Sequence, residues 1–307
     1  MNGNGLPVKD VISTLNYVRK FSGTTILIKL GGAALQDSKL VTSICKDLML
    51  IRSVGVQVVL VHGGGPSINQ ELTSKGIEWT FVDGQRVTTP EMMDVIEMVL
   101  CGSVNRRIVR TLNFAGVKAI GLSGTDGGTL VCKQSSKELG QVGAIDKVDT
   151  SVIHSVLNTQ HDTGTGAIPV IAPVGIGKDG QAFNINADWA AARIAQALGI
   201  TKMLFLTDQE GILDTEKKLI QELDAGELEN LIETGVVSGG MLAKVRTVLH
   251  ALRNGVKDVH VLNARHSHGL IEELFTDRGV GTVCRLRFRG SGGLSKGNPV
   301  KKETIHA

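Results

Sequence analysis

The chain has 307 residues, of which 33 are Lys or Arg and 30 are Asp or Glu, so its formal net charge is +3. This length allows one large or two modest domains with a substantial core. An aromatic content of 3 % argues against single-stranded nucleic-acid binding, which needs stacking platforms, and no run is long and apolar enough to span a bilayer. We expect a cytoplasmic protein without a signal peptide. Its cysteines, Cys45, Cys101, Cys132 and Cys284, are too far apart to indicate a metal site or a disulfide framework.

An amphipathic helix is predicted over Val8–Phe21, with Tyr17 beside its apolar stripe. It precedes the first predicted strand and is therefore an addition to the α/β core. We expect it to pack on its own protomer or on a partner.

The stretch Thr24–Ala34 predicts a buried parallel strand that leads into Lys29 and then into Gly31 and Gly32. Two interpretations stay open on these residues alone. Lys29 is the solvated end of a strand before a turn, or it holds a phosphate together with backbone N–H groups that glycine leaves accessible.

A second buried strand, Gln57–His62, runs into three glycines, Gly63 to Gly65, and then into a helix. The glycine-ended βαβ repeat indicates a parallel sheet. Three glycines before a helix favour an anion or carboxylate at the helix N-terminus over a plain turn. His62 reads as a strand-end histidine with a local hydrogen bond rather than as a base.

The middle of the chain continues the alternation of strands and helices. A β excursion over Ile77–Val87 carries Arg86, and Thr89 caps a long helix that should run to about Asn113. We expect strands at Val117–Gly121, Thr129–Lys133, Val142–Ile145 and Ile168–Ile171, a helix at Thr150–Asn158, and a turn at Gly175–Gly180.

Three polar side chains, Asn184, Asn186 and Asp188, fall where a helix over Ala187–Leu198 should begin. They would gather at its free N–H groups. An Asn186 N-cap and a dipole-complementing Asp188 account for only part of this cluster.

The last third repeats the pattern and ends in a basic tail. Lys202–Thr207 is a clear buried strand that ends at Asp208, and Lys244 lies in the first turn of the helix that follows Ser238-Gly239-Gly240. A lysine there opposes the helix dipole, which fits either a bound anion or a mildly unfavourable surface lysine. Further elements are helices at Ala225–Thr234 and Gly269–Phe275, strands at Val256–Leu262 and Gly281–Arg285, and a tail over 287–307 that we expect to be disordered.

The motifs of several other nucleotide and hydrolase folds are missing from the sequence. It contains no G-x-x-x-x-G-K-[ST] phosphate loop, no G-x-G-x-x-G dinucleotide fingerprint, no G-x-S-x-G elbow and no H-E-x-x-H zinc pair.

Together these pieces resemble the amino acid kinase superfamily and, within it, the N-acetylglutamate kinase family. The resemblance covers roughly Phe21 to Leu286. The matching stretches, in the family's order, are Ile28-Lys29-Leu30-Gly31-Gly32, Val61-His62-Gly63-Gly64-Gly65-Pro66, Gly84-Gln85-Arg86-Val87-Thr88, Asn184-Ile185-Asn186-Ala187-Asp188 and Gly239-Gly240-Met241-Leu242-Ala243-Lys244.

The fold that this resemblance implies is α/β, an open αβα sandwich with a mainly parallel central sheet and an extra N-terminal helix. It implies one domain over residues 1–286, in which 1–22 form the helix, about 23–180 bind the amino-acid substrate and about 181–286 bind ATP.

The implied activity is transfer of the ATP γ-phosphoryl group, with Mg²⁺, to the side-chain carboxylate of N-acetyl-L-glutamate in arginine biosynthesis. The resemblance places Lys29 and Lys244 at the transferred phosphoryl group and Asp188 between them. It assigns the acetylglutamate to Gly64, Gly65, Arg86 and Asn184, and the nucleotide to backbone N–H groups of Gly31 and Gly32 and to the stretch from Asp208 to Gly211.

The N-terminal helix and the C-terminal segment resemble the arginine-inhibited branch of that family. This implies arginine as an inhibitor and a homohexamer, a trimer of dimers interlaced by the helices. Nucleic-acid and membrane partners are not expected. The implied effector site consists of Tyr17, His268, Glu273, Gly279 and Gly281, against the alternative of a surface helix with a satisfied histidine.

The sequence also departs from the family pattern at Ala33, Thr125 and Gln209-Glu210, where other residues are more usual. Sister enzymes such as glutamate 5-kinase or aspartokinase therefore remain alternatives. Another is a non-catalytic arginine-sensing or partner-binding module, which should have lost the two lysines or the aspartate.

Overall fold

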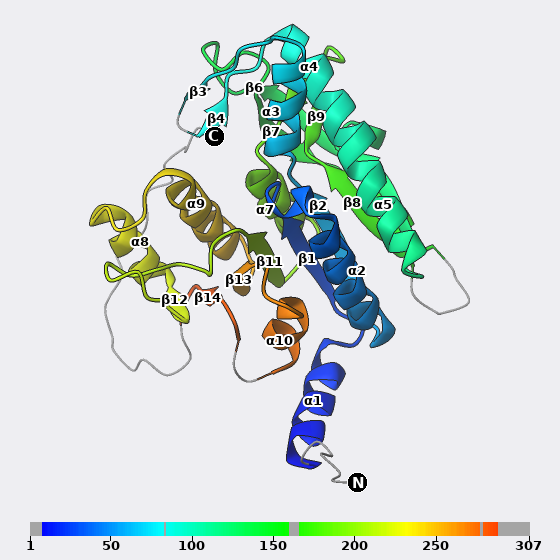
Figure 1. Cartoon of the computed structure of the whole chain (residues 1–307), viewed down its shortest axis with the longest axis vertical. Coiled ribbons are helices and arrows are strands. Elements are labelled where there is room, and N and C mark those ends of the chain that lie inside the picture. Colours follow the sequence, from blue (N-terminus) through cyan, green and yellow to red (C-terminus); the bar gives the residue numbers. More distant parts are fainter. Residues whose placement is uncertain (1–7, 83, 160–165, 277–278, 288–307) are drawn as a thin grey trace.

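A computed structural model describes residues 8–82, 84–159, 166–276 and 279–287. Its centre is an eight-stranded sheet in the order β12-β14-β13-β11-β1-β2-β8-β5 (Figure 1). Most neighbours pair in parallel, whereas β14 runs antiparallel to β13. The strands are β1 (Thr25–Leu30), β2 (Gln57–His62), β5 (Ala119–Ser123), β8 (Ile168–Ala172), β11 (Lys202–Thr207), β12 (Glu222–Asp224), β13 (Asp258–Asn263) and β14 (Thr282–Arg285).

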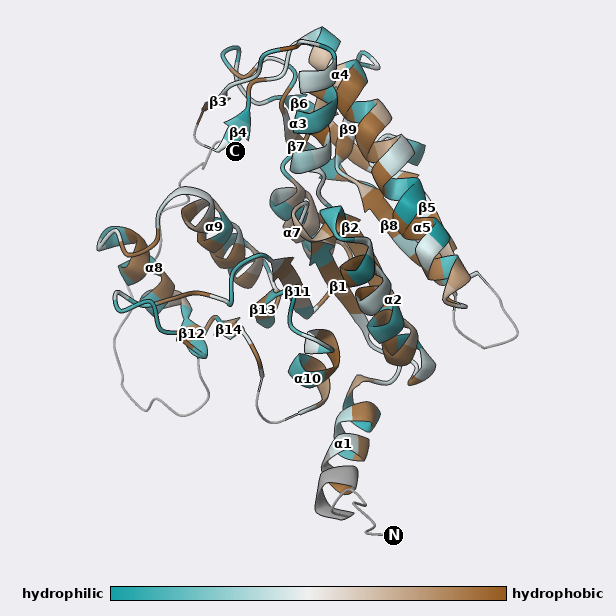
Figure 2. Ribbon diagram, viewed as in Figure 1, coloured by the Kyte–Doolittle hydropathy of each residue, from teal (hydrophilic) through white to brown (hydrophobic). Residues whose placement is uncertain are grey.

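Helices cover both faces of this sheet, because the central strands are apolar on both sides. Ile26 and Ile28 of β1 pack into one core, whereas Leu27 packs into the other. Figure 2 shows the hydrophobic strands between these layers. The first core receives α1 (Val8–Phe21), α2 (Ser38–Ser53), α3 (Gly65–Ser74), α4 (Pro90–Glu97), α5 (Asn105–Phe114) and α10 (Gly269–Phe275), and the second receives α6 (Ser151–Leu157), α7 (Ala187–Ala197), α8 (Ala225–Glu233) and α9 (Gly239–Arg253). The predicted αβα sandwich is confirmed.

The register brings the carboxyl ends of three central strands to one edge. Lys29 pairs with Phe205 of β11, and Leu30 pairs with His62 of β2. The loops that follow β1, β2 and β11 therefore lie side by side, and ligands of parallel sheets bind at such an edge.

Two features differ from the sequence prediction. The single long helix expected to Asn113 is interrupted by a π-helical segment, Met98–Val104, between α4 and α5. The expected turn at Gly175–Gly180 belongs to a hairpin, whose first strand is glycine-rich and has no distinctive apolar pattern. The hairpin strands β9 (Val174–Gly177) and β10 (Ala182–Asn184) join β6 (Leu130–Gln134) and β7 (Gly143–Val148) in a second sheet, while β3 (Phe81–Val82) and β4 (Gln85–Arg86) form the expected β excursion.

The N-terminal helix α1 extends away from the body of the molecule (Figure 1). Its last residue, Phe21, is buried and packs edge-on against Phe275 of α10, with ring centroids 5.9 Å apart. Ile12 and Leu15 remain 54 % and 59 % exposed, so α1 has an apolar surface that this protomer does not cover.

The thiols of Cys45, Cys132 and Cys284 are free and buried, and burial raises the pKa of each to about 12. No helix in the described part of the chain is long and apolar enough to cross a membrane. The basic tail after Arg287 lies outside the described residues.

Candidate functional site

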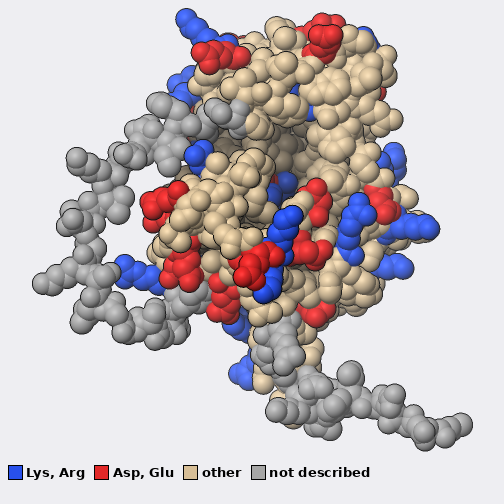
Figure 3. All heavy atoms as spheres, turned by 60° about the vertical axis from the view of Figure 1, so that its left-hand side comes forward, with Lys and Arg blue, Asp and Glu red and all other residues tan. Residues whose placement is uncertain are grey.

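Two cavities meet at the carboxyl edge of the sheet. The smaller has a volume of about 340 Å³ and the larger about 870 Å³. Figure 3 shows a hollow on this face with basic side chains inside it. The two cavities share five of their lining residues, Lys29, Gly32, Ala33, Asn186 and Asp188.

Two lysines share one carboxylate where the cavities meet. The Nζ atom of Lys29 lies 2.6 Å from Asp188 Oδ1, and that of Lys244 lies 2.6 Å from Asp188 Oδ2. Asp188 is held at the start of α7, where the Asn186 side chain accepts hydrogen bonds from the backbone N–H groups of Asp188 and Trp189. The structure thus confirms the N-cap and unites three residues that are far apart in the sequence. We call Lys29, Asp188 and Lys244 the ion triplet.

The ion triplet carries one positive charge in excess. Burial acts to raise the pKa of Asp188, but the two lysines outweigh it and hold that pKa far below its usual range. Burial lowers the pKa of Lys29 and the charge of Lys244 lowers it further, with Asp188 opposing. Because uncompensated charge is costly away from water, an anion bound here would stabilise the site.

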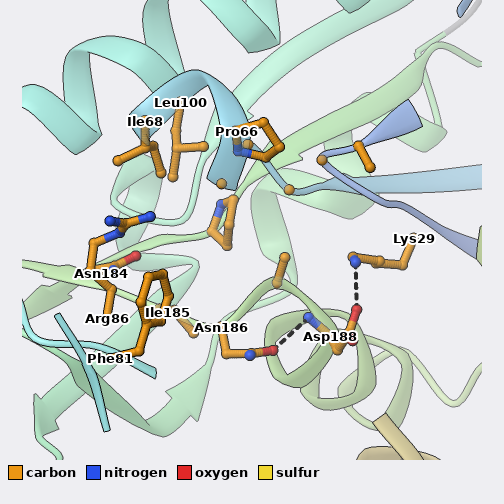
Figure 4. Close-up of a pocket in the computed structure, with 17 residues that line it drawn as sticks. Lys29, Pro66, Ile68, Phe81, Arg86, Leu100, Asn184, Ile185, Asn186 and Asp188 are labelled. Atoms are coloured by element: carbon orange, nitrogen blue, oxygen red, sulfur yellow. Dashed lines mark hydrogen bonds and ion pairs between the residues drawn. The ribbon is translucent and has the colours of Figure 1, made fainter. Parts of the chain in front are cut away.

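The smaller cavity holds a second cationic group at its other end, as Figure 4 shows. Arg86 is 6 % exposed, and its guanidinium carbon lies 4.7 Å from the ring centroid of Phe81. Its Nη2 donates to Asn69 Oδ1, while Nη1 is buried and has no partner among the described residues. Asn184 lies beside it, and its Nδ2 donates to Thr88 Oγ1 at 3.1 Å. The cavity therefore suits a small molecule with an anionic group at each end.

Two glycine loops form the wall between these ends. A Cβ atom on Gly32 would lie 3.0 Å from the backbone nitrogen of Gly65 and 3.1 Å from that of Gly64. The loops therefore need glycine at Gly32 to approach each other this closely. Gly64 is the N-cap of α3 and offers no side chain to its first N–H groups, which leaves them available to an anion.

The larger cavity reaches the start of α9. Asp208, Gly211 and Lys217 line it, together with Ser238, whose side chain makes no capping hydrogen bond to α9. Gly240 and Met241 in the first turn of α9 line the same space as Lys244, which is buried, and this favours the anion interpretation of Lys244 over the surface one.

One expected role needs correction. The backbone N–H of Gly31 donates to Leu206 O at 2.9 Å and is not available to a phosphate. Gly31 is needed there because a Cβ atom would lie 2.8 Å from that same oxygen. Gly31 lines the larger cavity, and its lack of a side chain allows its backbone to lie this close to Leu206.

The expected effector residues fall into separate groups. The Glu273 carboxylate accepts hydrogen bonds from His260 Nδ1 and from the backbone N–H groups of Val280, at 2.8 Å, and Gly281, at 3.2 Å. Gly279 lies against the same carboxylate, because a Cβ atom there would sit 2.6 Å from Glu273 Oε2.

Tyr17 and His268 have other contacts in the structure. Tyr17 stacks on Phe21 of the same helix, with ring centroids 6.4 Å apart. His268 caps the opposite end of α10 from Phe275, and its Nδ1 lies 2.7 Å from Asp47 Oδ1. The structure thus brings Glu273, Gly279 and Gly281 together, whereas His268 contacts Asp47 of α2.

Sequence analysis missed several residues around the cavities. Asn69 and Phe81 hold Arg86, Lys217 lines the larger cavity, and Asn105 contacts His62 beneath the glycine loop. No local sequence pattern marks these residues, because their contacts join segments that are far apart in the chain.

Comparison with known proteins identifies the family to which this chain is similar. The model of the amino acid kinase family matches residues 24–263. An acetylglutamate kinase of Vesicomyosocius okutanii is 44 % identical over 295 residues, which cover 92 % of this chain and 94 % of that one. Acetylglutamate kinases of Trichlorobacter lovleyi and Methanoculleus marisnigri are 44 % and 41 % identical, over 89 % and 91 % of this chain and 95 % and 99 % of theirs.

Solved structures show the same fold. The N-acetylglutamate synthase of Neisseria gonorrhoeae, complexed with coenzyme A and N-acetyl-glutamate, has a TM-score of 0.81 and 25 % identity over 92 % of this chain, which spans 64 % of the length of that synthase. Carbamate kinase of Giardia lamblia, bound to AMP-PNP, has a TM-score of 0.63 and 16 % identity, over 86 % of this chain and 99 % of that one.

Proposed function

The chain belongs to the amino acid kinase family, and from this premise we propose that it acts as an acetylglutamate kinase. It transfers the γ-phosphoryl group of ATP to the side-chain carboxylate of N-acetyl-L-glutamate, giving N-acetyl-L-glutamyl 5-phosphate and ADP for arginine biosynthesis. The observation that carries this proposal is the ion triplet, which lies between a small cavity with a cationic far end and a larger cavity at a helix N-terminus.

The acceptor occupies the smaller cavity. Its α-carboxylate binds Nη1 of Arg86, which has no partner within the described part of the chain, and its acetamido group binds Asn184, whose amide both donates and accepts. Its side-chain carboxylate lies at the other end, near the backbone N–H groups of Gly64 and Gly65 and the Lys29 ammonium. A volume of about 340 Å³ suits a ligand of this size.

ATP occupies the larger cavity, with its phosphates toward Gly32, Lys244 and the start of α9. Mg²⁺ accompanies the phosphates and takes most of its ligands from them and from water. Asp208 and Asp214 line this cavity and would offer the hard oxygen atoms that this ion prefers. No three His, Cys, Asp or Glu side chains of the described chain form a metal cluster.

The chemistry needs charge and alignment more than proton transfer. A carboxylate with a pKa of about 4.3 is already ionised at neutral pH, so no general base is required. The main energetic cost is the electrostatic repulsion between this carboxylate and the phosphates of ATP. Lys29 and Lys244 reduce this repulsion, and Asp188 fixes the positions of both lysines.

Regulation forms a finer part of the proposal. We propose that arginine inhibits the enzyme at a site near α1 and α10, with Tyr17, His268, Glu273, Gly279 and Gly281 as its candidate residues. The exposed apolar residues Ile12 and Leu15 support association of α1 with another copy, in a cytoplasmic hexamer.

The test of the activity traps acyl phosphate with hydroxylamine in the presence of Mg-ATP and N-acetyl-L-glutamate, with free glutamate and aspartate as controls. Product from acetylglutamate alone supports the proposal. Product from a control amino acid would move the function to a sister kinase. No product from any of the three would reject a kinase of this group.

A separate test addresses the oligomer. Gel filtration should give a hexamer for the full chain and dimers once the residues before Gly23 are removed. A shortened protein that stayed hexameric would contradict assembly through α1.

A further inference from the structure

We propose that His62 and Asn105 are positioning residues, which together fix the Gly63–Gly64 peptide so that its N–H faces the acceptor carboxylate. The inference rests on the proposed function, because the acceptor is the carboxylate that this kinase would phosphorylate. Both side chains are 0 % exposed, and neither lines either cavity. They therefore act through the glycine loop and not by contact with a substrate.

The orientation of the Asn105 amide is set by two backbone carbonyl groups. Its Nδ2 lies 2.8 Å from Val170 O and 3.4 Å from Leu122 O. Carbonyl oxygens only accept hydrogen bonds, so the group that faces them must be the NH₂ group. The same NH₂ group lies 3.1 Å from His62 Nε2. His62 Nε2 must therefore accept a hydrogen bond and carry no proton.

The proton of the neutral imidazole is consequently on Nδ1. This atom lies 2.9 Å from the carbonyl oxygen of Gly63 and donates to it. Burial, helped by the charge of Lys29, lowers the pKa of His62 to about 4, so the ring stays neutral at physiological pH. Asn105 thus selects the tautomer that can hold the Gly63 carbonyl.

The held carbonyl determines where the next N–H points. In a trans peptide the C=O and N–H groups point in opposite directions. The Gly63 carbonyl turns to His62, so the Gly64 N–H turns away from it, toward the other glycine loop. A Cβ atom on Gly32 would lie 3.1 Å from the Gly64 nitrogen. This N–H has no hydrogen-bond acceptor among the described residues, which leaves it for the acceptor carboxylate.

The irregular helix explains why Asn105 can reach His62. The π-helical segment ends at Val104, and Asn105 is the first residue of α5. A π-helical insertion turns the residues beyond it to a new face of the helix. The same segment packs on the loop, because a Cβ atom on Gly64 would collide with Leu100 Cδ2. Figure 4 shows Leu100 close to Pro66, at the start of α3.

A matched pair of variants tests the role. In His62→Asn, the side-chain NH₂ group occupies nearly the position of Nδ1 and can still donate to Gly63 O. In His62→Phe, the ring shape remains but no donor does. We expect His62→Phe to lower kcat by roughly 10- to 100-fold. This decrease is smaller than the one expected when a hydrogen-bond donor to the reacting group is itself removed. The KM for ATP should not change, and His62→Asn should recover most of kcat. A structural role alone would lower the amount of folded enzyme for both variants without this division.

Nitrogen NMR of the unaltered enzyme, labelled with ¹⁵N-histidine, tests the tautomer without any variant. The His62 signals, assigned by their loss in His62→Asn, should show a protonated Nδ1 and an unprotonated Nε2. A protonated Nε2 would overturn the inference, as would full kcat in His62→Phe beside an active wild type. A wild type that makes no acyl phosphate would instead reject the proposed function, and this inference with it.

Discussion

Two networks of ionic side chains lie at opposite ends of the central strands, one at the carboxyl edge of the sheet and one at the amino edge. At the carboxyl edge, the ion triplet has two cations and one acid, and it lines two cavities. At the amino edge, Lys202 and Asp258 begin β11 and β13, with Nζ and Oδ2 3.3 Å apart. Arg285 joins them through Nε, 2.8 Å from Asp258 Oδ1.

The amino-edge network continues into α10. Lys202 Nζ lies 2.7 Å from His260 Nε2, and His260 Nδ1 pairs with Glu273. Its two cations, Lys202 and Arg285, face three carboxylates, Asp258, Glu273 and Glu222, the last with Oε1 3.7 Å from Arg285 Nη1. An excess of positive charge beside a cavity indicates an anionic ligand, whereas carboxylates outnumber cations in the amino-edge network, whose ion pairs link β11, β13, β14 and α10.

Replacing one lysine at each edge should separate these roles most strongly. We expect Lys29→Met to lower kcat by roughly 10²- to 10³-fold, since one group that stabilises transition-state charge is lost. Lys202→Met should keep kcat and lower the urea midpoint of unfolding, because Asp258 and His260 lose a partner. Hydroxylamine trapping and urea titration measure the two effects. Equal loss of kcat in both variants would break the distinction between the edges.

Two arginines offer the next contrast. Nη1 of Arg86 has no partner among the residues that the structure describes, whereas Arg285 is paired with Asp258. Arg86→Lys should raise the KM for acetylglutamate roughly 10- to 100-fold, since a charged hydrogen bond contributes about 1.5–3 kcal/mol. Arg285→Lys should leave that KM unchanged. Steady-state kinetics at saturating ATP measures this KM. An unchanged KM in Arg86→Lys would contradict a role of Arg86 in binding the acceptor.

Glu273→Gln should act on stability. Glu273 is buried and accepts three hydrogen bonds, so the loss of its charge should lower the free energy of unfolding by about 1–3 kcal/mol. Glu222→Gln provides the control, because Glu222 is 60 % exposed and its distance to Arg285 is 3.7 Å. Urea unfolding at pH 7 measures both. Equal changes would contradict the importance of the buried Glu273 carboxylate.

The smallest expected effect is the pH dependence of the stability that Glu273 contributes. Burial acts to raise the pKa of Glu273, but the hydrogen bonds from His260, Val280 and Gly281 outweigh it and the pKa is lowered. The folded state then binds fewer protons than the unfolded state, so this stabilisation is present above pH ~4.3 and is lost as pH falls. The stability gap between wild type and Glu273→Gln should narrow below about pH 4 in urea titrations. A constant gap would show that the carboxylate charge contributes nothing.

Much of the fold follows from local sequence patterns. Lys202–Thr207 was predicted as β11 residue for residue, and Asn186 as the cap of α7, because continuous apolar runs and capping side chains act over a few residues. The β9–β10 hairpin was missed, since Val174-Gly175-Ile176-Gly177 is too short and glycine-rich to stand out.

Within the site, the sequence by itself determined the candidates: Lys29 after an apolar strand, Asp188 at a helix start and Lys244 in a helix after two glycines. It left open whether either lysine meets an anion. Only the tertiary structure decided that both lysines share Asp188, because the order β11-β1-β2 brings distant loops to one edge. The same holds for Gly31, whose N–H is bound to Leu206, and for the contact between Asn105 and His62. Hydrogen-bond partners across a sheet depend on strand order and register, which local sequence patterns do not specify.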